Sequence, residues 1–141
     1  MGAAGALVLA GLALVVAAPP RPGVAAEKCA PPSGFAPRGR LEAGGVVVLY
    51  RTLPPDIVLG RHFAVEALVC GEGAAPALTR VDATMPEHRH GMNYRPTLAS
   101  KGDGRYLAEG LMFHMPGRWE LSFDVENGGR RTRLATDLNV E

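Results

Sequence analysis

The sequence predicts an all-β domain of the immunoglobulin-like sandwich type, with about seven strands after an N-terminal signal peptide. Short apolar runs with a two-residue period recur along the chain, and turns rich in Gly, Pro and Asn separate them. No helical period extends beyond a turn or two. At 141 residues the chain is long enough for one domain. Two antiparallel sheets packed face to face suit such a set of strands.

The first 26 residues have the character of a secretory signal. An apolar run from Gly2 to Ala18 is followed by Val24-Ala25-Ala26, small residues of the kind that precede a signal-peptidase cut. No Lys or Arg precedes the apolar run, so retention as an uncleaved anchor stays open, although Leu7–Ala18 is short for a membrane span of about 20 residues. We expect residues 1–26 to direct export, which makes the protein periplasmic or secreted.

The charge balance of the mature chain excludes one class of partner. Cleavage after Ala26 removes a single charged residue, Arg21, and leaves 14 Lys and Arg against 14 Asp and Glu. A domain without net charge is not suited to binding nucleic acid or anionic lipid. We therefore expect no nucleic-acid partner.

The two cysteines, Cys29 and Cys70, are expected to form a disulfide. An even cysteine count in an exported chain favours this pairing. The bond would close a loop of about 40 residues, worth on the order of 3–4 kcal/mol in the chain-entropy model. A pair of thiolate metal ligands is the alternative, and the lack of a Cys-x-x-Cys spacing disfavours it.

The first half of the chain predicts a leader and three strands. Residues 27–44 are rich in Pro, Gly, Ala and Arg without a hydrophobic period, so we expect an irregular leader before a domain that covers residues 45–141. The β-branched run at 45–50 predicts the first strand, and residues 62–70 predict the second because alternate positions are apolar. Residues 78–85 alternate in the same way and predict the third.

The second half predicts four more strands. Residues 93–98 indicate a strand that Pro96 interrupts or places at an edge. A Lys-Gly-Asp-Gly turn at 101–104 separates it from an extended run at 106–113. The clearest period-2 pattern follows at 119–126, with an Asn-Gly-Gly hairpin turn and a last strand at 130–140. The residues expected on the buried face of that clearest strand are Trp119, Leu121, Phe123 and Val125.

Two segments concentrate imidazole and thioether side chains. Met85–Met92 and Met112–Trp119 together hold three of the four histidines and four of the five methionines. Such side chains suit a soft or borderline metal ion such as copper. The candidate metal ligands are His88, His90, Met92, His114 and Met115.

The spacing of these residues suggests how they would converge. If residues 88–92 are extended, His88, His90 and Met92 point toward one side, because alternate side chains of a strand share a face. In the second segment His114 and Met115 are adjacent, so an extended chain directs only one of them toward the first segment. Which one points inward stays open.

The ligand types favour copper over other ions. His and Met without Cys or a carboxylate cluster suit Cu(I), and His-rich subsets also hold Cu(II). A structural zinc site would use Cys or four His, Asp and Glu groups, and no Asp-x-Asp loop indicates calcium or magnesium. The alternative is a β-domain whose turns carry His and Met without binding metal. On that interpretation His62 is solvated and Met112 fills the core.

An ordered set of motifs extends across both segments. It consists of Met85-Pro86-x-His88-x-His90-Gly91, then Gly104-x-Tyr106, then Gly110-Leu111-x-Phe113-x-Met115-x-Gly117-x-Trp119-Glu120-Leu121. Over roughly residues 61–140 this set resembles the YtkA-like domain family, small exported β-sandwiches similar in outline to FixH-type and CopC-type proteins. The resemblance implies an immunoglobulin-like domain outside the cytoplasmic membrane, with a role in copper handling or oxidase assembly. The residues that fall on the family's motif positions are His88, His90 and Met115, whereas Met92 and His114 are additions of this sequence.

Three functions are weighed on these observations. The first is an exported copper-binding protein, a carrier, buffer or metallochaperone that passes the ion to a membrane or periplasmic cuproprotein by ligand exchange. The second is a non-metal, immunoglobulin-like accessory or interaction subunit of a membrane complex, in which exposed Met and aromatic side chains dock a partner. An enzyme is not expected, because none of the three serines lies in a Gly-x-Ser-x-Gly setting.

Overall fold

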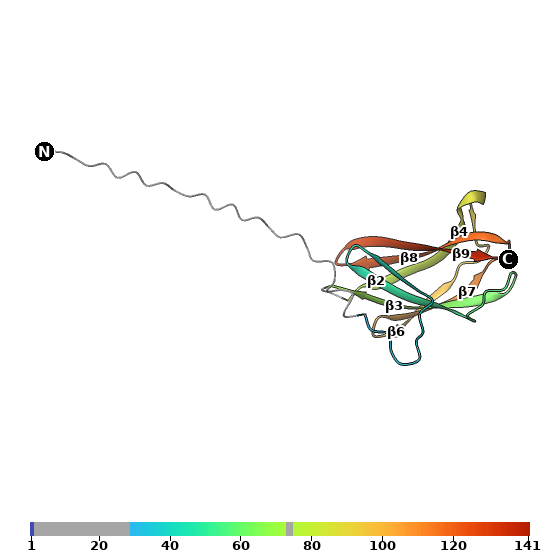
Figure 1. Cartoon of the computed structure of the whole chain (residues 1–141), viewed down its shortest axis with the longest axis horizontal. Coiled ribbons are helices and arrows are strands. Elements are labelled where there is room, and N and C mark those ends of the chain that lie inside the picture. Colours follow the sequence, from blue (N-terminus) through green and yellow to red (C-terminus); the bar gives the residue numbers. More distant parts are fainter. Residues whose placement is uncertain (2–28, 73–74) are drawn as a thin grey trace.

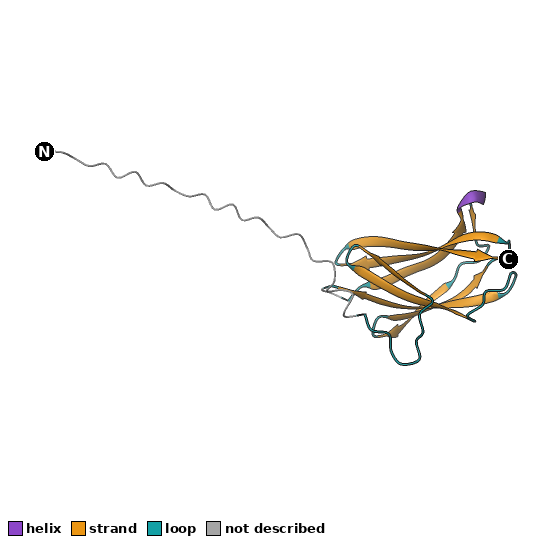
Figure 2. Cartoon of the chain, in the orientation of Figure 1, coloured by secondary structure: helices purple, strands orange, loops and turns teal. Residues whose placement is uncertain are grey.

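The predicted sandwich is confirmed. The computed structural model of the chain describes Met1 and residues 29–72 and 75–141, so the expected signal peptide lies outside the described residues apart from Met1. The described residues form nine strands in a five-stranded and a four-stranded antiparallel sheet, and the two sheets pack face to face (Figure 1). The only helical element among the described residues is a 3-10 turn, η1 (Pro86–His88), which projects from one end of the strands (Figure 2).

The strand order reproduces the immunoglobulin arrangement. The five-stranded sheet runs β1 (Gly39–Ala43), β2 (Val46–Leu53), β3 (His62–Gly71), β7 (Arg105–Met112) and β6 (Thr97–Gly102). The four-stranded sheet runs β5 (His90–Gly91), β4 (Ala77–Met85), β8 (Gly117–Asn127) and β9 (Arg130–Val140). Without the short edge strands β1 and β5, four strands face three, as in a constant-type immunoglobulin domain. The expected count of about seven therefore describes the central strands, and two edge strands are added.

The main core lies between the two sheets, and β8 supplies its largest side chains. The four apolar residues of its inward parity are fully buried, as the alternation predicted. β9 adds Leu134 and Leu138 opposite Phe123 and Trp119. Burying each such side chain stabilises the fold by about 1.5–3 kcal/mol, so the inward face of β8 fixes the strand register. The four residues of that face are Trp119, Leu121, Phe123 and Val125.

A second, smaller core closes one end of the outer face of the five-stranded sheet. Val47 and Leu49 point away from the main core, and the leader covers them with Cys29 and Phe35. The predicted disulfide is confirmed between Cys29 and Cys70, whose Cα atoms lie 5.6 Å apart. It ties the leader to the end of β3. Such a bond indicates an oxidising, extracytoplasmic compartment.

The expectation of an irregular leader through residue 44 was wrong for residues 39–43. These residues form β1, which pairs with β2 from Gly39 opposite Tyr50 to Ala43 opposite Val46. A Cβ atom at Gly39 would lie 2.5 Å from a carbon of the Tyr50 ring, so glycine permits this close approach. The pairing is with a strand rather than within the leader, which is why local sequence did not indicate it.

The strand expected at residues 93–98 was also misplaced. Pairing with β7 begins at Thr97, opposite Glu109, and continues to Gly102. Pro96 has no N–H to donate to a neighbouring strand, so the ladder starts after it. Residues 92–96 instead connect the two sheets.

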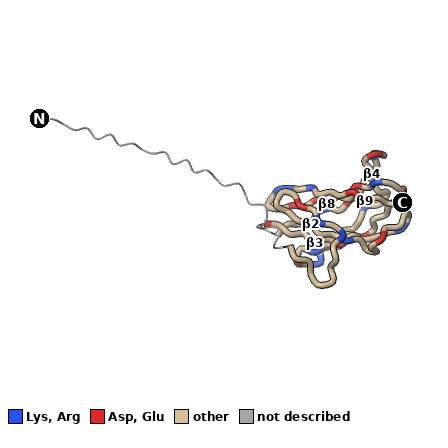
Figure 3. The backbone as a smooth tube through the Cα atoms, viewed as in Figure 1, with Lys and Arg blue, Asp and Glu red and all other residues tan. Residues whose placement is uncertain are grey.

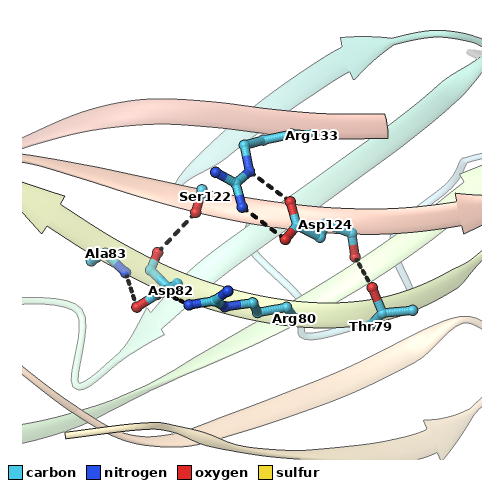
Figure 4. Close-up of polar contacts among 7 residues, drawn as sticks. All are labelled: Thr79, Arg80, Asp82, Ala83, Ser122, Asp124 and Arg133. Carbon is cyan, nitrogen blue, oxygen red and sulfur yellow. Dashed lines mark hydrogen bonds and ion pairs between the residues drawn. The ribbon is translucent and has the colours of Figure 1, made fainter. Parts of the chain in front are cut away.

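The outer face of the four-stranded sheet carries a polar network (Figure 4). Arg133 donates two hydrogen bonds to the Asp124 carboxylate, at 2.7 and 2.9 Å, and Asp124 is only 9% exposed. These bonds hold the pKa of Asp124 below its usual range, although burial acts in the opposite direction. Thr79 donates to the backbone carbonyl of Asp124, and Arg80 pairs with Asp82. Charges of both signs are mixed along the visible backbone (Figure 3).

Among the described residues, none lies in a helix long and apolar enough to cross a membrane.

Candidate metal centre

The two segments rich in His and Met meet at one end of the sandwich. β4 ends at Met85, and its residue Thr84 pairs with Glu120 near the start of β8. The short β5 folds back on β4, with His90 opposite Met85. The β7–β8 connection, which carries His114, lies at this same end. The disulfide lies at the other end, because β3 begins beside Met112 and reaches Cys70 near its far terminus.

The premise that residues 88–92 are extended was wrong. Pro86 begins η1, which contains His88, and Arg89 adopts a left-handed conformation with φ 55° and ψ 36°. The Arg89 N–H donates to the Pro86 carbonyl at 3.3 Å and closes the turn. His88 and His90 therefore do not alternate along one strand. A proline at the first position of a turn and a left-handed residue after it reverse the chain between them.

The turn nevertheless brings imidazoles together around His90. Its ring centre lies 5.8 Å from that of His88 and 5.2 Å from that of His114. Two imidazoles on one ion have ring centres about 5–6 Å apart, given a metal–nitrogen bond of about 2.0 Å and about 1.2 Å from nitrogen to ring centre. The spacing of each pair is thus compatible with a shared ion.

The His114 ring faces the first segment. It contacts the ring of His90, and its Nδ1 atom is buried without a hydrogen-bond partner in the described structure. An unsatisfied buried polar nitrogen costs about 1–3 kcal/mol. A bound cation in contact with this nitrogen would remove that cost. By contrast, the Nδ1 atom of His90 lies 3.2 Å from the Gly91 carbonyl oxygen.

Trp119 borders the imidazoles, a role that its assignment to the core did not anticipate. Its ring is fully buried and stacks on Phe113 at 4.5 Å with an interplanar angle of 8°. Its ring centre also lies 5.9 Å from His90 and 5.4 Å from His114. The indole N–H donates to the Met115 carbonyl at 3.0 Å, which fixes the turn that carries His114. The short spacing from His114 to Trp119 across Pro-Gly is the sequence signal that could have linked them.

The methionines divide into three groups. Met92 and Met115 are half-buried and pack against the main core at this end, so both remain candidate ligands. Met85 is 1% exposed and belongs to the core. The interpretation of Met112 as core filler was wrong: it is partly buried but lies outside both core clusters, because β7 directs Leu111 inward and the next side chain outward.

An ion-pair chain holds the turn that carries His88. Arg118 on β8 contacts Glu87 at 2.9 Å and Asp137 on β9 at 3.0 Å. Hydrogen bonding, first to Glu87 and then to Asp137, raises the pKa of Arg118 above its usual value. The exposed His88 is thereby held beside the half-buried His90.

Nitrogen and carboxylate ligands alone do not complete a site. Within residues 29–72 and 75–141, no three His, Cys, Asp or Glu side chains group as ligands of one ion. The arrangement consists of two imidazole pairs that share His90. Thioether sulfur from Met92 or Met115 is the further donor that this end of the sandwich offers, and sulfur selects a soft ion.

No protein-family model, curated protein or solved structure matches this chain. The resemblance to YtkA-like domains therefore rests on the motif residues, and what the structure shows is a small two-sheet β-sandwich.

Proposed function

We propose that this protein is an exported, non-enzymatic copper-binding protein that carries, buffers or delivers Cu(I) outside the cytoplasm. The observation that supports this function most directly is the position of His90. Its ring lies 5.2 and 5.8 Å from two other imidazoles, at an end of the molecule that also carries half-buried thioethers.

The donor set favours Cu(I) as the cargo. Thioether sulfur is a soft ligand, and imidazole accepts copper in either oxidation state, so Cu(II) remains compatible with the histidines alone. Zinc commonly binds thiolate ligands, and neither cysteine can supply one because both form the disulfide. Calcium and magnesium require grouped carboxylates, which this end does not supply among the described residues.

The burial of the ligands suggests an order of exchange. His90 and His114 are half-buried against Trp119, whereas His88 is exposed on η1. In the pair that His88 forms with His90, the exposed imidazole can be replaced by a ligand of a recipient before the half-buried one releases the ion. His88 would therefore be the exchanging ligand, and a membrane or periplasmic cuproprotein would be the recipient.

The motif resemblance supports the same function. His88, His90 and Met115 fall on the positions at which YtkA-like domains carry His-x-His-Gly and Met-x-Gly-x-Trp motifs. His114 is an addition of this sequence, and its ring is the one that contacts His90. The additional histidine gives His90 a second imidazole neighbour beside His88.

One observation counts against the alternative of a non-metal accessory subunit. A docking surface at this end would draw on its methionines, yet Met85 is 1% exposed and offers no surface to a partner. Besides Met1, the large apolar side chains exposed among the described residues are Leu53 at 38%, Val58 at 51% and Tyr94 at 48%. A few exposed apolar residues are normal on a protein surface and do not by themselves indicate a partner.

The test is a competition titration with Cu(I) against a chromophoric chelator. We expect the double variant H88A/H90A to bind Cu(I) at least about 100-fold more weakly than the wild type, because two ligands are lost. The matched control is N93A/T97A, which changes one exposed residue of the neighbouring connection and the exposed first residue of β6 without offering or removing a soft ligand. Circular dichroism checks that both variants fold. Unchanged Cu(I) affinity in a folded H88A/H90A protein would overturn the proposal.

A further inference from the structure

The fourth histidine and the remaining methionine, which is partly buried, form a pair outside the site described above. His62 begins β3 and Met112 ends β7, and the register places them directly opposite each other. Residues in this relation have Cβ atoms about 4.5–5.5 Å apart. An imidazole and a thioether are thus placed within reach of a common ion.

Both side chains point away from the core. The residues next to them, Phe63 and Leu111, are buried at 4% and 0% exposure, so strand alternation directs His62 and Met112 outward. His62 is exposed and Met112 is partly buried. The Tyr94 ring meets the His62 ring at 5.2 Å and 71°, which restricts how the imidazole can turn.

The position of Met112 is not explained by packing in either core. Its side chain is partly buried, yet it lies outside both core clusters, so its burial contributes to neither of them. Its soft sulfur on an outward strand position is therefore available for another purpose.

The pair lies beside the inner site. Met112 is separated from His114 only by Phe113, whose ring is buried against Trp119. The Gly60 N–H donates to the Phe113 carbonyl at 2.8 Å and fixes the loop before β3 against this same segment. An ion held at the surface by His62 and Met112 would lie near the segment that carries the His114 imidazole, because Met112 and His114 are separated in sequence by a single residue.

We propose that His62 and Met112 form a second Cu(I) site, an exposed two-ligand acquisition point that loads the His90–His114 site. This inference rests on the proposed function. The ion remains Cu(I) throughout, and only its ligands exchange. With two ligands and open access to water, the outer site binds more weakly than the inner one and releases its ion to it.

The experiment follows anaerobic addition of Cu(I) to the protein with chelators of graded strength, together with NMR of methyl-labelled methionine. Wild type should bind two equivalents, the second at least about tenfold more weakly, and the Met112 methyl signal should shift with the second. H62A/M112L should lose the weaker equivalent, keep the tight one, and load it more slowly from a chelator. H90A/H114A should lose the tight equivalent and keep the weaker one.

The possible failures are distinct. A single tight equivalent in the wild type, an unmoved Met112 signal, or two equivalents in H62A/M112L would overturn the outer site and leave the inner one standing. An unchanged loading rate in H62A/M112L would overturn its role in acquisition. If the wild type retains only a weak equivalent that H62A/M112L abolishes, the proposed function of the inner site fails instead. The Met112 methyl signal of the wild type tests the outer site even where a variant does not fold.

Discussion

The two ends of the sandwich are closed by different chemistry. At one end the Cys29–Cys70 disulfide and Phe35 cover outward-facing residues of β2 and β3 with apolar surface. At the other end imidazoles, an indole and thioethers meet, and the Nδ1 atom of His114 is buried without a partner. The first end is closed by a covalent bond, whereas the second retains a buried nitrogen atom that has no hydrogen-bond partner in the folded protein.

This contrast separates stability from binding. A covalent closure and a satisfied apolar cluster contribute to folding and offer no exchangeable ligand. An end with an unsatisfied nitrogen and half-buried sulfur gives up some stability and gains donors for an ion, as functional sites commonly do. Removing the disulfide should therefore lower the unfolding free energy without changing Cu(I) affinity, whereas removing the buried imidazole should raise the unfolding free energy and weaken Cu(I) binding.

The largest effect is expected at the disulfide end. The double variant C29A/C70A should lose about 3–4 kcal/mol of unfolding free energy, because the bond closes a loop with a sequence separation of 41 residues. Urea denaturation measures this loss. Cu(I) affinity, measured where the variant is folded, should match the wild type. A parallel loss of Cu(I) affinity would show that the two ends are not independent.

At the other end, removing a polar group should stabilise the protein. In H114L the buried Nδ1 atom without a partner is replaced by apolar surface, so we expect the metal-free protein to gain about 1–2 kcal/mol of unfolding free energy while Cu(I) binding weakens sharply. Thermal and urea denaturation give the first result, and chelator competition gives the second.

The control for that substitution is H88L, made at an exposed histidine of the same cluster. It should change the stability of the metal-free protein by less than about 0.5 kcal/mol. If H114L destabilises the metal-free protein as a typical core substitution does, the buried nitrogen has a partner in solution.

A smaller effect is expected on the outer face of β8, which belongs to neither end. D124N should cost about 1 kcal/mol at pH 7, a value limited by the exposure of Arg133. Because the folded-state pKa of Asp124 is lowered, its contribution is present above the unfolded pKa of about 4 and is lost as pH falls through the folded value.

The difference in stability between wild type and D124N should therefore narrow below about pH 4. Denaturation midpoints collected across this range measure it. A difference that is constant with pH would show that Arg133 does not act on the ionised carboxylate. Cu(I) affinity at neutral pH should not change in this variant.

Strand parity explains what could be predicted of the fold. The alternation from Trp119 to Val125 fixed one buried face of β8, and each of its apolar residues is fully buried. β1 was missed because its pairing with Tyr50 and Val46 depends on another strand rather than on its own sequence. Local periodicity reports which face is buried, but it does not report which edge receives an added strand.

The candidate site was predicted in its residue types and not in its geometry. Composition identified the histidines, but the extended path assumed for residues 88–92 is replaced by η1 and the left-handed Arg89. The proximity of His114 to His90 depends on how the turn at η1 and the β7–β8 connection pack around Trp119. Such contacts are set by tertiary packing, which neither spacing nor parity specifies.

The most direct measurement is a titration of the purified wild-type protein with Cu(I) against a chromophoric chelator, run beside the same titration with Zn(II). If the end of the sandwich that carries His90 and His114 is a copper site, one tight Cu(I) equivalent should be found, with Zn(II) bound much more weakly. Micromolar or absent binding of both ions would contradict the copper function and leave the imidazole cluster as part of the turn packing.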